Sequence, residues 1–194
     1  MKRFLAVFIT TLFLTIAAAA QEHSPRPSRP APSTPSAPPR NTPTAAVPAW
    51  VKFISEEGSF SVLMPGTPKE TVETSQSEHG PYTTHIVVLR EDPNVFMVGW
   101  VDYDPSFNFN RVAELEANRD NFVSGTKATL VETRSATIYG YPAIEFTAEN
   151  ADRVFKSRVV MVGRRPYQIV IGSPKEADDS ANIKRFFDSF KVTR

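Results

Sequence analysis

The sequence predicts an α+β domain built on a largely antiparallel sheet. After Trp50, short segments rich in β-forming residues follow one another and are joined by turn-forming residues. Two other segments repeat their apolar residues at helical spacing. Strands in consecutive hairpins with a few interspersed helices are typical of this fold class.

The first strands are indicated by alternation and by their turns. Phe60–Met64 alternates and stops at Pro65 and Gly66, which form a turn signal. Segments 82–89 and 95–103 are two β-rich runs joined by residues 91–94, a pattern that predicts a hairpin. The second run has apolar residues on both faces, so we expect it in the middle of a sheet that is covered on both sides.

The remaining elements alternate between helical and strand patterns. Segment 110–124 places a mainly apolar stripe at helical spacing, and Gly125 is the expected stop; the stripe comprises Val112, Leu115, Arg119, Phe122 and Val123. A last helix is expected at 177–190, with Ile183, Phe186, Phe187 and Phe190 facing inward. Further strands are expected at 129–138, 143–148, 154–162 and 167–171, with turns at 140–142 and 163–166.

The chain of 194 residues divides into three parts, which are a signal peptide at 1–20, a Pro-rich linker at 21–48 and one domain at 49–194. Lys2 and Arg3 precede an apolar stretch, and four alanines end at Ala20, which is typical of a cleaved secretory signal. The predicted location is therefore extracytoplasmic, either periplasmic or secreted. An uncleaved anchor is the alternative, because the apolar stretch is at the short limit for spanning a bilayer.

The linker holds nine of the 17 prolines of the chain. Such a composition forms no core, because proline interrupts both helices and strand ladders. We expect an extended spacer. A ligand for a Pro-recognising partner and an O-glycosylated stalk are the alternatives.

Composition excludes several classes of function. The chain contains no Cys, which removes thiol catalysis, thiolate zinc sites and a lipoprotein anchor. Residues 49–194 carry 17 basic and 20 acidic side chains. A slightly acidic domain argues against nucleic acid as a partner, because that surface needs a basic stripe.

Four segments together resemble one family of exported domains. Residues 60–68 resemble its opening strand and turn, 140–146 its Gly-x-Pro-Ala-x-Glu-Phe segment, 165–168 after Arg158 its late hairpin, and 186–190 its closing helix. The family is the PsbP-like group, which also contains the Ran-binding Mog protein, and the likeness is to its exported bacterial branch. The resemblance implies an α/β/α sandwich around an antiparallel sheet. It also implies a module that binds other macromolecules and has no shared catalytic constellation.

The histidines are the first candidates for chemistry. His23 lies in the linker, His79 lies in an expected turn, and His85 lies in a strand where it is either a ligand or base or an ordinary hydrogen-bonded residue. His79 and His85 share a strand face but lie about 20 Å apart on a straight strand, which is too far for a common zinc ion. No Gly-x-Ser-x-Gly elbow occurs in the sequence.

Carboxylates supply the remaining candidates. Asp102 and Asp104 lie in the most oxygen-rich stretch, which is either a weak Ca²⁺ site or a turn with a helix cap at Asn108 or Asn110. Glu145 is expected to pair with Arg158 or Arg165 across neighbouring strands, and such pairs are structural more often than catalytic.

These observations predict an exported, non-enzymatic binding or accessory module of the cell envelope, without a cofactor. Its partner is an envelope protein or another macromolecule, and it meets the membrane only transiently through the signal segment. Expected contact residues are His85, Glu145, Arg158, Arg165, Tyr167, Asp102 and Asp104, with turn aromatics (Tyr103, Phe107, Phe109, Tyr139 and Tyr141) as further anchors.

Two other functions stay open. One is a small ligand carrier or hydrolase with a pocket between sheet and helix, lined by residues such as His85, Glu145, Arg158 or Tyr167. The other is a cation-dependent structural module at Asp102 and Asp104.

Overall fold

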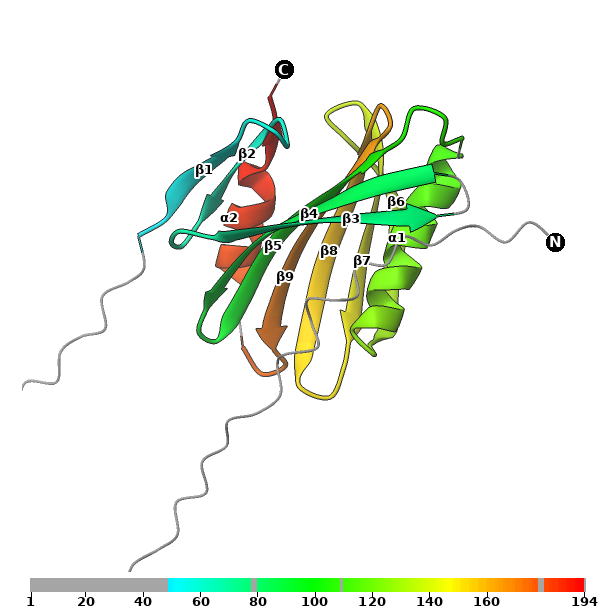
Figure 1. Ribbon diagram of the computed structural model, residues 1–194. Coiled ribbons are helices and arrows are strands. Elements are labelled where there is room, and N and C mark those ends of the chain that lie inside the picture. Colours follow the sequence, from blue (N-terminus) through cyan, green and yellow to red (C-terminus); the bar gives the residue numbers. More distant parts are fainter. Residues whose placement is uncertain (1–48, 78–79, 109, 178–179, 194) are drawn as a thin grey trace, which may run out of the picture.

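A computed structural model of the chain describes residues 49–77, 80–108, 110–177 and 180–193 (Figure 1). The predicted signal peptide and linker, with His23, lie outside the described residues, as do His79 and Phe109. Within the described ranges, neither helix has the length and apolar character needed to cross a membrane.

A seven-stranded sheet forms the centre of the domain. Its spatial order is β3 (Lys69–Ser77), β4 (Gly80–Glu91), β5 (Asn94–Tyr103), β9 (Arg165–Pro174), β8 (Arg153–Val162), β7 (Tyr141–Glu149) and β6 (Thr129–Ile138). Every neighbouring pair is antiparallel, which confirms the predicted sheet type. β5 and β9 are buried along most of their length, as expected for central strands with apolar residues on both faces.

Two layers cover the large sheet (Figure 1). Helix α1 (Arg111–Gly125) packs on one face, against β7, β8 and β9. Helix α2 (Ser180–Ser189) and a second, three-stranded sheet pack on the other. That small sheet has the order β1 (Val51–Ser55), β2 (Phe60–Met64) and β10 (Lys191–Val192). The α+β prediction is confirmed, and the small sheet is an unpredicted addition.

Each face of the large sheet has its own apolar core. The core shared with α2 and the small sheet centres on Phe60, Trp100 and Phe190, with ring centroids of Phe60 at 5.4 Å from Trp100 and 5.5 Å from Phe190. The core under α1 contains Leu115 and Phe122. Burial of large aromatic side chains is the main favourable contribution to holding these layers together.

Helix α1 differs from the predicted stripe in one respect. Asn110 caps it by accepting hydrogen bonds from the backbone of Val112 and Ala113, and Gly125 is its last residue, both as predicted. Val112, however, is 61% exposed. Glu114 and Asn118 are buried instead, because Glu114 accepts hydrogen bonds from the Tyr103 hydroxyl and the Asn118 amide.

Candidate functional site

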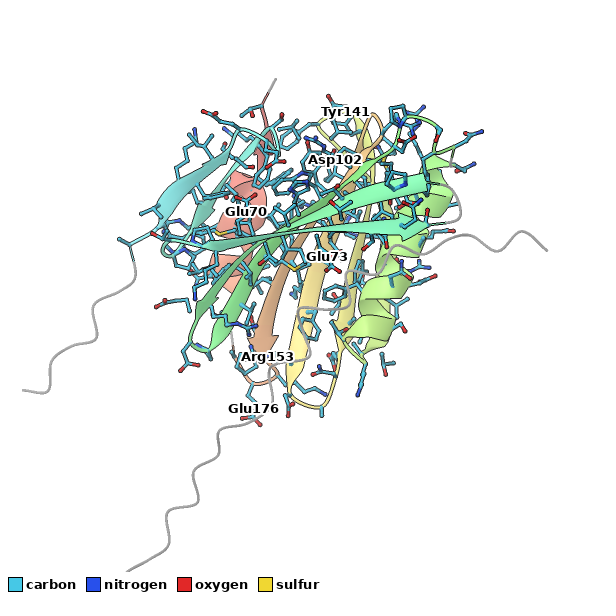
Figure 2. The ribbon with its side chains drawn as sticks, viewed as in Figure 1. Glu70, Glu73, Asp102, Tyr141, Arg153 and Glu176 are labelled. Atoms are coloured by element: carbon cyan, nitrogen blue, oxygen red, sulfur yellow. The ribbon has the colours of Figure 1, made fainter. Side chains whose placement is uncertain are left out.

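The β1–β2 turn meets strands β3, β4, β5 and β9 of the large sheet. The polar side chains that gather there form a cluster, which we name the turn cluster: Glu57, Glu70, His85, Asp102, Arg165 and Tyr167. Four of its members are predicted site residues, namely His85, Asp102, Arg165 and Tyr167. Glu57 and Glu70 were not predicted as site residues. Figure 2 labels Glu70 on β3 and Asp102 on β5.

His85 lies at the centre of the turn cluster. It is directly opposite Trp100 in the β4–β5 ladder, and the two rings stack with centroids 4.5 Å apart and planes 6° apart. The side chain of His85 is 2% exposed. Its Nε2 faces Asp102 Oδ2 at 3.5 Å, and its Nδ1 faces Glu57 Oε1 at 3.8 Å. The imidazole therefore lies between two carboxylates, with its ring plane set by stacking on Trp100.

Arg165 and Tyr167 tie the turn to the large sheet. Arg165 Nε donates to Asp102 Oδ1 at 2.6 Å, and Arg165 Nη1 donates to the Glu57 carbonyl at 3.0 Å. The Tyr167 hydroxyl donates to the Gly58 carbonyl at 2.8 Å. These hydrogen bonds satisfy turn carbonyls that the small sheet leaves unpaired. Both side chains therefore stabilise the turn.

Burial and hydrogen bonding shift the ionisation of both residues. Burial raises the pKa of the Tyr167 hydroxyl, and the nearby Arg165 guanidinium only partly opposes that shift. For Arg165, burial alone lowers the pKa, but the hydrogen bonds to Tyr167 and Asp102 outweigh it and the pKa rises. Tyr167 is therefore a neutral donor and Arg165 a fixed cation at physiological pH.

The local sequence explains why the β1–β2 turn reaches this point. Gly58 donates its backbone N–H to Ser55 Oγ at 2.9 Å, which closes the turn. A Cβ at Gly58 would lie 2.6 Å from the Phe60 ring, so only glycine fits against that core residue. The turn therefore packs tightly and presents Glu57 beside His85.

Glu145 and Arg158 form a separate pair on β7 and β8. They are directly opposite each other in the ladder, and Arg158 donates to Glu145 Oε1 from Nε at 2.8 Å and from Nη2 at 2.7 Å. Arg134 binds the second carboxylate oxygen. The predicted pairing of Glu145 with Arg158 is confirmed, whereas the alternative partner Arg165 binds Asp102 instead.

These two groups do not meet in one pocket. β7 and β4 are four strand spacings apart, which separates Glu145 from His85 by about 19 Å. An open depression of about 340 Å³ does lie between α2 and strands β6 to β8. Of the four residues that the carrier or hydrolase hypothesis placed in its pocket, Glu145 alone lines this depression.

Asp104 does not join Asp102. Hydrogen bonds from the Ser106 side chain and backbone lower the pKa of the Asp104 carboxylate, while Asp102 faces Arg165 and His85. Each carboxylate therefore has its own partners. The turn aromatics that were expected as partner contacts differ in burial. Phe107 is buried, whereas Tyr139 is 59% exposed and donates a hydrogen bond from its hydroxyl to the Phe190 carbonyl.

Comparison with known proteins returns structural likeness only. Neither the family models nor the curated proteins give a match to this chain. The chain is similar to cyanobacterial PsbP from Synechocystis sp. PCC 6803, with 8% identity, a TM-score of 0.46, and coverage of 76% of this chain and 95% of that one.

Two further solved structures show weaker likeness. One is a Bacteroides thetaiotaomicron protein, with 13% identity, a TM-score of 0.35, and coverage of 74% of this chain and 48% of that one. The other is a Pseudomonas aeruginosa protein of unknown function, with 10% identity, a TM-score of 0.32, and coverage of 65% and 83%. At such identities the comparisons describe an arrangement of strands and helices and say nothing of activity.

Proposed function

We propose that this protein is an exported, non-enzymatic binding module of the cell envelope, and that it acts by docking on another protein. The N-terminal sequence pattern motivates export, and residues 21–48 are proposed as the spacer that lets the domain reach its partner. The observation that carries the docking proposal is an uncovered surface beside α2.

That surface, which we name the open face, is the part of strands β6 to β8 that the small sheet does not cover. Its floor is charged and its wall is apolar, with Ile183 and Phe187 of α2 along one side. A second depression of about 220 Å³ continues it and shares Lys156 and Ile183. A shallow, open and mixed surface of this kind suits a protein partner better than a small molecule, which is usually enclosed.

Charge supports a partner that presents an acidic side chain. Arg134 and Arg158 both bind Glu145, so two positive charges share one carboxylate and the group stays net positive. Lys156 is exposed and, within the described residues, forms no ion pair. An acidic group of a partner that reaches Lys156 gains a contact without displacing an existing pair.

Site-specific cross-linking in cells tests the proposal. A photoreactive residue at Ile183 is expected to give one discrete cross-linked product in the envelope fraction, and purified mature protein should compete it away. The matched control is Glu116 on α1, exposed on the opposite face of the large sheet, which should give none. Equal cross-linking at both positions would contradict a specific interface.

A charge reversal separates docking from folding. Lys156→Glu should weaken the cross-linked product at least tenfold, whereas Lys52→Glu on β1, also an exposed strand lysine, should leave it unchanged. Sequencing the mature N-terminus tests export, with Gln21 as the expected first residue. If purified protein turned over a substrate, and lost that turnover on replacement of His85 or Glu145, the hydrolase alternative would replace this proposal.

A further inference from the structure

The imidazole of His85 has an unexplained feature. It is almost fully buried and stacked on Trp100, yet within the described residues its Nδ1 has no hydrogen-bond partner. A buried polar nitrogen without a partner costs free energy, and native structures normally satisfy such atoms with a protein group, a water molecule or an ion.

Two carboxylates converge on this imidazole from different elements. Glu57 comes from the β1–β2 turn, and Glu70 comes from β3, where it lies on the same face as His85 because Val72 is the residue directly opposite His85. One ligand atom from each of Glu57, Glu70 and His85 lies within 4.8 Å of the other two. Small side-chain rotations bring such atoms to the spacing of ligands around one ion.

Asp102 supplies the support that metal-binding histidines commonly have. It faces Nε2 of His85, the nitrogen away from Glu57, and Arg165 holds its other oxygen. A carboxylate on one imidazole nitrogen favours the proton there and leaves the lone pair on the other nitrogen free for a metal. Here that other nitrogen is the unpartnered Nδ1, aimed towards Glu57.

We propose that Glu57, Glu70 and His85 form a binding site for one divalent transition-metal ion of the zinc class. Imidazole and carboxylate together favour Zn²⁺ over Ca²⁺ and Mg²⁺, which prefer oxygen ligands alone. Asp102 and Arg165 compensate each other's charge, so the two glutamates match the charge of one divalent cation. Both glutamates are exposed, so the ion enters from solvent and water fills the remaining positions.

The ion would join the small sheet to the edge of the large one, because its ligands come from the β1–β2 turn, β3 and β4. Binding should therefore stabilise the folded chain. Mature protein treated with a chelator and then given ZnCl₂ is expected to unfold about 5 °C higher at saturating zinc, with one site by calorimetry. The same concentration of CaCl₂ should give a much smaller shift.

Matched variants assign the effect to the cluster. Glu57→Gln and Glu70→Gln should each lower the zinc affinity at least tenfold and remove most of the shift. The control is Glu73→Gln, because Glu73 is also an exposed carboxylate of β3, on the opposite face. His85 is buried, so His85→Gln alone could prevent folding. The zinc-dependent shift of Glu57→Gln, a variant at an exposed position, is therefore the deciding measurement.

Two outcomes would overturn the proposal. One is an unfolding temperature that zinc does not change. The other is a shift of equal size in the wild type and in Glu57→Gln, which would place the zinc at another histidine such as His23. Neither result bears on the open face, so the docking proposal stands or fails separately.

Discussion

The ion pair between Glu145 and Arg158 provides the sharpest test of a structural role for the predicted polar residues. Arg158→Met keeps most of the apolar stem and removes the guanidinium, and Glu145→Gln removes the carboxylate charge. A double-mutant cycle with these two variants measures the coupling between the two side chains.

Burial sets the expected magnitude of that coupling. The side chains of Glu145 and Arg158 are 15% and 17% exposed. Exposed pairs contribute about 0.2–1 kcal/mol, and removing one partner of a fully buried pair costs about 3–5 kcal/mol. A mostly buried pair that is joined by two hydrogen bonds should therefore have a coupling energy of about 1–2 kcal/mol. Arg158→Met should cost about 0.5–1 kcal/mol more than Glu145→Gln, because its guanidinium also lies 5.1 Å from the centre of the Phe187 ring.

Urea unfolding followed by circular dichroism measures these differences in the mature protein. Arg134→Met is the matched control, because Arg134 binds the same carboxylate but is 67% exposed, and it should cost under about 0.5 kcal/mol. A coupling below about 0.3 kcal/mol, or equal costs for Arg134→Met and Arg158→Met, would refute the reasoning from burial.

Three other predictions test the interior and the turn. Burial raises the pKa of Glu114, so the stability that this side chain contributes is present at acidic pH. That stability is lost as the pH rises above about 4.3 through the folded-state pKa. Glu114→Gln should abolish this loss when the free energy of unfolding is measured across pH. Tyr167→Phe removes the hydroxyl bond to the Gly58 carbonyl and should cost about 1 kcal/mol in urea unfolding. Gly58→Ala places a Cβ 2.6 Å from the Phe60 ring and should cost about 1–3 kcal/mol; an unchanged Tm would contradict the packing of the turn.

Much of the large sheet is predictable from local patterns. The apolar runs at 82–89 and 95–103 and the turn between them specify the β4–β5 hairpin, and the Asn110 cap specifies the start of α1. The sequence did not predict β3 (Lys69–Ser77), because all of its nine residues except Val72 are polar. An edge strand of that kind has no alternation to detect, and only its pairing with β4 defines it.

The candidate site also has a part that the sequence predicts and a part that it does not. Glu145 with Arg158 follows from residues expected on adjacent strands. The approach of Glu57 and Glu70 to His85 does not, because nothing in their neighbourhood in the chain distinguishes them from solvated surface glutamates. Without the small sheet, which local pattern did not predict, the β1–β2 turn has no defined place.

The sequence by itself determined which segments alternate as strands, which turns interrupt them and which side chains are apolar enough to be buried. Those properties depend on neighbours along the chain, through backbone geometry and side-chain period. Only the tertiary structure decided which polar residues share a space, because the distance between β1, β3 and β4 depends on how two sheets pack around Phe60 and Trp100. A buried histidine between two carboxylates is a property of that packing, and no local pattern encodes it.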